Sequence, residues 1–156
     1  MNKKNVSIVM IVVSVSLLFL SSCQTVKKTI APDGFAAYTG TTEPFRAVSP
    51  DGVMFSVRST KNEPYAALDF WKVALKKHLL DSGYYFIKEA DIKSGTETGY
   101  MLEVSAPVDN QSYIYATAIF VQKDKIIIAE SAGTVLSFES KRKAVMDAIR
   151  NLRIEE

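Results

Sequence analysis

The chain has 156 residues, and its 19 basic and 17 acidic side chains give a formal net charge of +2 at neutral pH. The whole excess comes from Lys3 and Lys4, so residues 23–156 are balanced and give no reason to expect nucleic acid, which usually binds a basic surface. Cys23 is the single cysteine, which excludes an internal disulfide and leaves one hydrophobic core to stabilise the fold.

Residues 1–22 have the three-part pattern of a secretion signal peptide. Lys3 and Lys4 supply the positive start, an apolar stretch runs from Val6 to Leu20, and small residues then lead into Cys23. The apolar stretch holds 15 residues, whereas a membrane-spanning helix needs about 20. A short transmembrane anchor is therefore the second interpretation.

The residues before the cysteine, Leu20, Ser21 and Ser22, together with Cys23 resemble the lipobox of bacterial lipoproteins. The resemblance implies cleavage before Cys23 and attachment of a diacylglyceryl group to its sulfur, often followed by acylation of the new amino group. A thiolate is a strong nucleophile, and two or three acyl chains hold a protein on a membrane where one binds marginally. Cys23 is the expected lipid-attachment site, and an unmodified cysteine after an ordinary signal peptide is the alternative.

A lipoprotein of this kind is held outside the cytoplasm. Gln24 follows the cysteine, whereas in enteric-type lipoproteins an aspartate at this position marks retention in the inner membrane. We therefore expect the periplasmic side of the outer membrane if the organism is diderm, and the cell membrane otherwise.

Residues 23–44 are expected to be the lipidated cysteine and a flexible tether, followed by one globular domain over residues 45–156. The tether has no sustained hydrophobic period and is rich in threonine, glycine and proline. A flexible chain of this length spans roughly 25 Å. The alternative is that residues 35–38 pack onto the domain as an edge segment.

The domain begins with two short strands within residues 45–59, joined by the turn sequence SPDG at residues 49–52. Residues 62–83 then predict a helix, with Asn62 as its cap and Gly83 as its stop. The helix carries an apolar stripe at Leu68, Trp71, Leu75 and Leu79.

Four further strands are expected at residues 84–92, 99–106, 112–122 and 125–131. The continuous run Ile126, Ile127 and Ile128 is typical of a central strand that is covered on both faces. A last helix, capped by Ser137 or Ser140, closes the chain. This order predicts an α+β fold, with an antiparallel sheet of about six strands packed by two helices.

The same order, with residues 144–152 in a terminal helix after a hairpin, resembles the PsbP-like fold of photosystem accessory subunits and of several bacterial lipoproteins. The resemblance covers the topology of residues 45–156 and includes no diagnostic motif. It implies a non-catalytic accessory or binding role.

The sequence offers few groups for catalysis. His78 is the single histidine, and no Gly-x-Ser-x-Gly elbow supplies an activated serine for it. One histidine and an acylated cysteine cannot build a transition-metal site, so no metal or cofactor is expected. Glu89 and Asp91 share one strand face and are the remaining catalytic candidates, although Lys88 and Lys93 beside them are typical of a solvated strand end.

Two surfaces are candidates for binding. The last helix is basic, and it would face an anionic membrane through Lys141, Arg142, Lys143, Arg150 and Arg153, or else be an ordinary solvated face. Several strand tyrosines line a groove or pack against a helix: Tyr84, Tyr85, Tyr100, Tyr113 and Tyr115.

The sequence thus favours a membrane-anchored, non-catalytic envelope lipoprotein with a binding or accessory domain. Its expected contacts are the membrane, through the lipid anchor, and either another envelope protein or a lipid. One alternative is a lipid or small-ligand carrier with a cavity between sheet and helix. The other is a carboxylate-dependent envelope hydrolase that uses Glu89 and Asp91.

Overall fold

The computed structural model describes residues 29–38, 44–108 and 111–154. The predicted signal peptide and the lipid-attachment site Cys23 lie outside the described residues, so both remain predictions.

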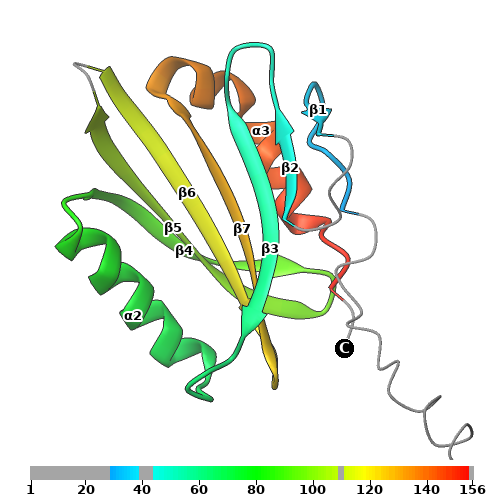
Figure 1. Ribbon diagram of the computed structural model, residues 1–156, viewed down its shortest axis with the longest axis vertical. Helices are drawn as coiled ribbons and strands as arrows, with labels where there is room; N and C mark the ends of the chain where they lie inside the picture. Colours follow the sequence, from blue (N-terminus) through cyan, green and yellow to red (C-terminus); the bar gives the residue numbers. More distant parts are fainter. Residues whose placement is uncertain (1–28, 39–43, 109–110, 155–156) are drawn as a thin grey trace, which may run out of the picture.

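In the described part of the chain, seven strands form one antiparallel sheet in the order β1-β2-β3-β7-β6-β5-β4 (Figure 1). The strands are β1 (Ala36–Ala37), β2 (Phe45–Val48), β3 (Met54–Lys61), β4 (Tyr85–Ser94), β5 (Glu97–Val108), β6 (Gln111–Val121) and β7 (Lys125–Thr134). The two helices are α2 (Leu68–Asp81) and α3 (Val135–Arg150). The fold is α+β, as the sequence predicts.

The sheet has one strand more than the six expected, because residues 36 and 37 pair with β2. Ala36 lies opposite Val48, and Ala37 lies opposite Ala47. The sequence offered an edge segment within residues 35–38 as the alternative, and this alternative is observed. The domain boundary at residue 44 stays a prediction.

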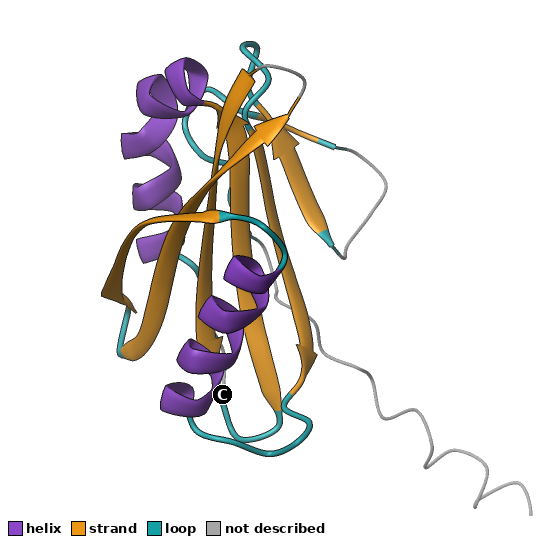
Figure 2. Ribbon diagram, turned by 90° about the vertical axis from the view of Figure 1, so that its left-hand side faces the viewer, coloured by secondary structure: helices purple, strands orange, loops and turns teal. Residues whose placement is uncertain are grey.

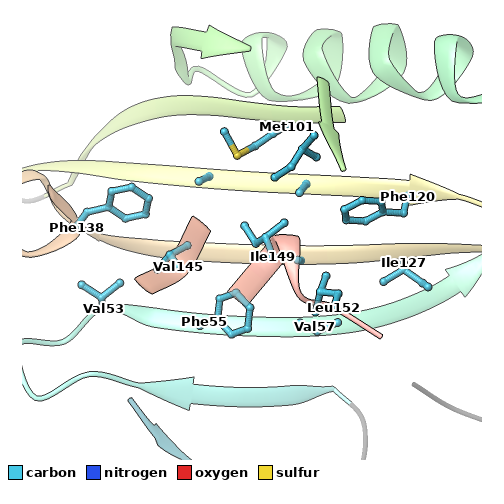
Figure 3. Packing of buried hydrophobic residues seen from close by; sticks show 14 of the residues in the cluster. Val53, Phe55, Val57, Met101, Phe120, Ile127, Phe138, Val145, Ile149 and Leu152 are labelled. Atoms are coloured by element: carbon cyan, nitrogen blue, oxygen red, sulfur yellow. The ribbon is translucent and has the colours of Figure 1, made fainter. Parts of the chain in front are cut away.

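The larger core lies between the sheet and α3 (Figure 3). Phe138, Val145 and Ile149 of α3 are fully buried against alternate residues of the sheet. The sheet contributes Val53, Phe55, Val57, Ile92, Met101, Ile114, Ala116, Ala118, Phe120, Ile127 and Ala129. In Figure 1, α3 lies behind β3 and β2.

The second core lies on the opposite face of the sheet, beneath α2 (Figure 2). Its buried members are Leu79 of α2 and the strand residues Tyr100, Leu102, Val104, Ile119 and Ile126. Because successive strand residues point to opposite faces, Ile126 packs under α2 whereas Ile127 packs under α3. β7 is thus covered on both faces, as its isoleucine run predicts.

The turn between β2 and β3 forms as expected. Gly52 has a φ of +83°, which favours glycine, and its N–H donates to the carbonyl of Ser49. The hydroxyl of Ser49 donates to Asp51 Oδ1 at 2.6 Å and accepts from the N–H of Val53 at 2.9 Å. These hydrogen bonds hold the short turn that joins β2 to β3.

Both helix starts differ from the sequence predictions. α2 begins at Leu68 after Ala67, and no side chain caps it, so Asn62 is not its cap. α3 follows β7 directly, and Thr134 is its cap, because its Oγ1 accepts from the N–H of Ser137.

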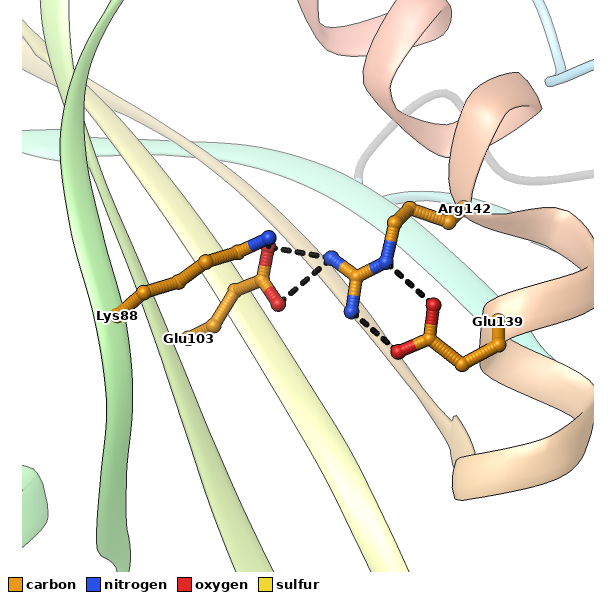
Figure 4. Close-up of polar contacts among 4 residues, drawn as sticks. All are labelled: Lys88, Glu103, Glu139 and Arg142. Atoms are coloured by element: carbon orange, nitrogen blue, oxygen red, sulfur yellow. Dashed lines mark hydrogen bonds and ion pairs between the residues drawn. The ribbon is translucent and has the colours of Figure 1, made fainter.

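A buried carboxylate joins α3 to β5 (Figure 4). Glu103 has no exposed surface, and both of its oxygens accept from Arg142 Nη1, at 2.6 and 2.7 Å. Arg142 also donates to Glu139 through Nε and Nη2, each at 2.7 Å. Lys88 Nζ of β4 lies 3.3 Å from Glu103 Oε1. The cluster therefore ties an edge strand, an inner strand and α3 together.

Candidate binding groove beneath helix α2

Helix α2 covers one face of the sheet with two different flanks. Leu75 and Leu79 point down into the core beneath it. Lys72 and Lys76 lie on one flank, and Ala74 and His78 lie on the other, since residues two apart on a helix are separated by about 200°. The first flank faces β4 and the second faces β7 and β3.

The flank that faces β4 is lined by ion pairs. Lys72 Nζ lies 2.8 Å from Asp91 Oδ1, and Lys76 Nζ lies 3.0 Å from Glu89 Oε1. Tyr100 donates its hydroxyl to the other oxygen of Glu89. An open hollow of about 410 Å³ remains here, lined by these five residues with Val73 and Ala90.

The environment of Glu89 is opposite to that of a general acid. The hydrogen bond from Tyr100 and then that from Lys76 hold the pKa of Glu89 below its usual value. A general acid at neutral pH needs a raised pKa, as burial away from cations provides. Burial and the Glu89 carboxylate in turn raise the pKa of Tyr100. Glu89 and Asp91 do share a strand face, but each is paired with a lysine.

The other flank of α2 leaves a groove of about 400 Å³ between the helix and the sheet. Its lining is mostly apolar and consists of Thr60, Lys61, Glu63, Trp71, Ala74, Leu75, His78, Ile119, Ile126 and Ile128. The volume lies within the range of about 300–1,000 Å³ that is usual for small-molecule sites. We call this feature the α2 groove. It lies between sheet and helix, which is where the carrier alternative from the sequence predicts a cavity.

Trp71 is fixed in the wall of the α2 groove by Asn62. The indole Nε1 donates to Asn62 Oδ1 at 2.8 Å, and the amide nitrogen of Asn62 donates to the carbonyls of Ala66 and Gln122 at 3.0 and 2.9 Å. Asn62 is buried, so these bonds form away from solvent. Trp71 is also the single tryptophan of the chain and reports on the groove by its fluorescence.

A polar cluster adjoins the α2 groove on the same sheet face. Arg58 lies opposite Ile128 of the groove in the pairing of β3 with β7. Its guanidinium donates to Glu130 at 3.3 and 3.4 Å, and the hydroxyl of Tyr115 donates to Glu130 Oε1 at 2.6 Å. Burial first, and then the bond to Glu130, raise the pKa of Tyr115.

A shallow hollow of about 200 Å³ lies beside this cluster. Only strand residues line it, namely Arg46, Met54, Ser56, Tyr115, Glu130, Ser131 and Ala132. Arg46, Ser56 and Glu130 lie side by side across β2, β3 and β7, because Arg46 pairs with Ser56 and Ser56 pairs with Glu130. We call this feature the arginine hollow.

The other candidates from the sequence are distributed over the fold. His78 lies at the exposed rim of the α2 groove. Tyr84 and Tyr115 pack with their ring centres 5.9 Å apart, Tyr100 is buried under α2, and Tyr85 is exposed. The tyrosines therefore do not gather into one groove.

The last helix is less basic than its sequence suggests. Arg142 is bound by Glu103 and Glu139, and Lys143 pairs with Asp147. Three of the five basic side chains, Arg142, Lys143 and Arg150, thus have an acidic partner, so the surface expected to face a membrane is neutralised in part.

Among the described residues, no group of three histidine, cysteine or carboxylate side chains is placed to hold a metal ion. Neither described helix combines the length and the apolar character that a bilayer crossing requires.

Sequence reasoning missed Arg46 and Glu130. The alternation of Ser56 and Arg58 with Phe55 and Val57 already places Arg58 away from the α3 core. The neighbours of Arg58 depend on the register of β2, β3 and β7, and the sequence contains no signal for that register.

No protein-family model matches the chain, and no curated protein matches it. Solved structures that share its fold include LpqN, PA94 and a cyanobacterial PsbP. LpqN, involved in cell envelope biogenesis of Mycobacterium tuberculosis, has a TM-score of 0.57 and 14% identity, over 80% of this chain and 78% of LpqN. PA94 of Pseudomonas aeruginosa, a protein of unknown function described as a putative regulator, has a TM-score of 0.54 and 10% identity, over 78% of this chain and 98% of PA94.

Cyanobacterial PsbP from Synechocystis sp. PCC 6803 has a TM-score of 0.51 and 12% identity, over 87% of this chain and 99% of PsbP. At these identities the likeness shows the fold alone. The PsbP-like topology expected from the order of strands and helices is confirmed at that level.

Proposed function

We propose that this chain is an envelope lipoprotein, anchored through Cys23, whose domain binds a ligand in the α2 groove without transforming it. The observation that carries the proposal is the groove itself, a mostly apolar space of about 400 Å³ between α2 and the sheet. An apolar space of this size is costly to leave in contact with water, and such sites usually serve binding.

The location is supported by the sequence and by one relative in fold. The charged start, the apolar stretch and the lipobox-like residues before Cys23 are the pattern of an exported, lipidated chain. LpqN, which shares the fold, is involved in cell envelope biogenesis. An anchor of this kind would hold the α2 groove near the membrane, where apolar ligands are concentrated.

The non-catalytic character is supported by the state of the two candidate carboxylates. Asp91 is paired with Lys72, and Glu89 is bound by both Lys76 and Tyr100. Neither lies in the α2 groove, which instead carries isoleucine, leucine and tryptophan side chains. The groove thus supplies contact area and few reactive groups.

Metabolic labelling of the full chain with palmitate tests the anchor. We expect label on the wild type and on Ser22→Ala, which keeps a small residue before the cysteine, and none on Cys23→Ala. Label on Cys23→Ala, or none on the wild type, would overturn the lipoprotein proposal.

Trp71 emission tests ligand binding in the α2 groove. We expect decyl maltoside, added to the lipidated chain in phosphatidylcholine nanodiscs, to shift the emission to shorter wavelength. Ala74→Phe fills the groove and should abolish the shift, whereas Val73→Phe, on the exposed side of α2, should keep it. Equal responses of the two variants would contradict binding in the groove.

Another envelope protein is the second candidate partner. Phe70 and Val73 on the outer side of α2 are exposed by 52% and 69%, and large exposed apolar side chains are typical of contact surfaces. A photoreactive residue at Val73 should then crosslink one reproducible protein in intact envelopes. Absence of any reproducible crosslink under several growth conditions would remove this candidate.

A further inference from the structure

We propose that the ligand of the α2 groove is a single-chain amphiphile with an anionic head group, its apolar chain in the groove and its head in the arginine hollow. The inference rests on the proposed binding function and adds the chemical class of the ligand. It depends on three observations: the groove and the hollow adjoin each other, Arg46 and Arg58 have few partners, and the two features differ in the charged side chains that line them.

The α2 groove and the arginine hollow adjoin each other on one face of the sheet. Ile128 of the groove and Glu130 of the hollow are two residues apart on β7, so their side chains point to the same face. Arg58 lies opposite Ile128 and reaches Glu130, so it stands at the junction. A ligand longer than the groove would extend past Arg58 into the hollow.

The two features differ in the charged groups that they carry. The groove is lined mainly by Trp71, Leu75 and three isoleucines, whereas the hollow adds Arg46, Glu130, two serines and a tyrosine hydroxyl to the apolar Met54 and Ala132. A mostly apolar wall with charged groups at one end matches a molecule with an apolar chain and a charged head.

The cations of this surface are available to an anion. Among the described residues, none pairs with the guanidinium of Arg46. Arg58 is held by one partner, Glu130, at 3.3 and 3.4 Å, which is long for a charged hydrogen bond. Arg46 lies opposite Ser56 on β2, and Arg58 follows Ser56 by two residues on β3, so both arginines adjoin Ser56 on the same sheet face and an anionic group beside Ser56 would lie near both guanidinium groups and the hydroxyl.

Glu130 sets the selectivity of the hollow. Its carboxylate accepts from Tyr115 and from Arg58, so one acid opposes two arginines and the cluster keeps a net positive charge. An anionic group would therefore offset this excess. The bond from Tyr115 also holds Glu130 toward β6, away from Arg46 on β2.

The test compares two probes that differ only in the head group. The lipidated full chain is placed in phosphatidylcholine nanodiscs, and brominated decyl phosphate or brominated decyl maltoside is added as a quencher of Trp71. We expect both probes to quench and the phosphate to bind about 10-fold more tightly, as one charged contact provides. Ala74→Phe measures the quenching that comes from probe dissolved in the lipid.

Replacing both arginines separates the head group from the chain. Arg46→Gln combined with Arg58→Gln should weaken decyl phosphate about 10-fold and leave decyl maltoside unchanged. Arg46→Lys combined with Arg58→Lys keeps the charge and should recover most of the affinity, while Lys77→Gln on the outer side of α2 should change nothing. Thermal unfolding of each variant verifies that it is folded.

The outcomes distinguish this inference from the function on which it rests. Equal affinity for the two probes, or equal weakening of both by the arginine replacements, would overturn the anionic head group and leave groove binding in place. Equal quenching in Ala74→Phe and the wild type would contradict groove binding, and the inference would fall with it. A third outcome is that an apolar peptide reverses the quenching by the brominated probe whereas decyl phosphate without bromine does not. That result would assign the groove to a protein segment and overturn the inference.

Discussion

Glu103 and Arg142 form a buried ion pair between the sheet and α3: two carboxylate oxygens accept from one guanidinium nitrogen, and Glu103 has no exposed surface. Arg142→Met removes the main partner and leaves a buried charge, so the free energy of unfolding should fall by about 3 kcal/mol, the lower end of the usual range because Lys88 stays near. Urea unfolding followed by circular dichroism measures the loss.

Two variants control this prediction. Lys143→Met removes an exposed pair with Asp147 and should cost at most about 1 kcal/mol. Glu103→Leu combined with Arg142→Met removes both charges and should recover most of the loss. An Arg142→Met variant as stable as the wild type would show that the pair contributes nothing to stability.

Asn62 should matter for the α2 groove although it does not cap the helix. Asn62→Ala deprives the Trp71 indole and two carbonyls of their partners, which should cost about 2 kcal/mol of stability. Trp71 emission in the folded state should shift as well. Asn151→Ala, which removes one exposed bond to the carbonyl of Asp147, should stay within about 0.5 kcal/mol of the wild type.

Gly99 is required by a close approach of two strands. A Cβ atom at this position would lie 2.5 Å from the carbonyl oxygen of Ile119 and 2.6 Å from the ring of Phe120. Because the oxygen belongs to the backbone of β6, Gly99→Ala should destabilise the domain by about 1–3 kcal/mol. Thr98→Ala, at an exposed neighbour, is the matched control. A Gly99→Ala variant with unchanged thermal unfolding would contradict the packing described for β5 and β6.

Acid should weaken the ion-paired flank of α2, which faces β4. The hydrogen bonds from Tyr100 and Lys76 hold the pKa of Glu89 below its usual 4.5, so the unfolded chain binds this proton first and the stabilisation is lost as the pH falls below 4.5. Thermal unfolding at about pH 6 and about pH 3 should show a smaller decrease in midpoint for Glu89→Gln than for the wild type. An equal decrease would show that Glu89 does not contribute to the pH dependence.

The order of the elements follows from the sequence, because each buried stripe has a clear period. Leu75 and Leu79 repeat at helical spacing, and Ile126 to Ile128 indicate a strand covered on both faces. The predicted start of α3 was wrong because β7 continues into α3 without a loop, so Thr134 rather than a later serine caps the helix. Hydrophobic periodicity alone does not locate such a junction.

The candidate site was predictable only in part. A cavity between sheet and helix was one alternative, but its position depends on how α2 is rotated, and the buried Leu79 and the bond from Trp71 to Asn62 constrain that rotation. Glu103 follows the apolar Leu102 on β5, and this alternation predicts that Glu103 faces solvent. In the structure α3 covers Glu103. Such contacts join residues far apart in the chain, and one sequence does not reveal them.

Native mass spectrometry of the lipidated chain released from envelopes tests the central claim, that the α2 groove is a binding site, most directly. We expect the wild type and Val73→Phe to carry the same additional mass, which collisional activation releases as a small amphiphile, and Ala74→Phe to lack it. The same bound mass on all three chains, or none on any of them, would contradict the claim.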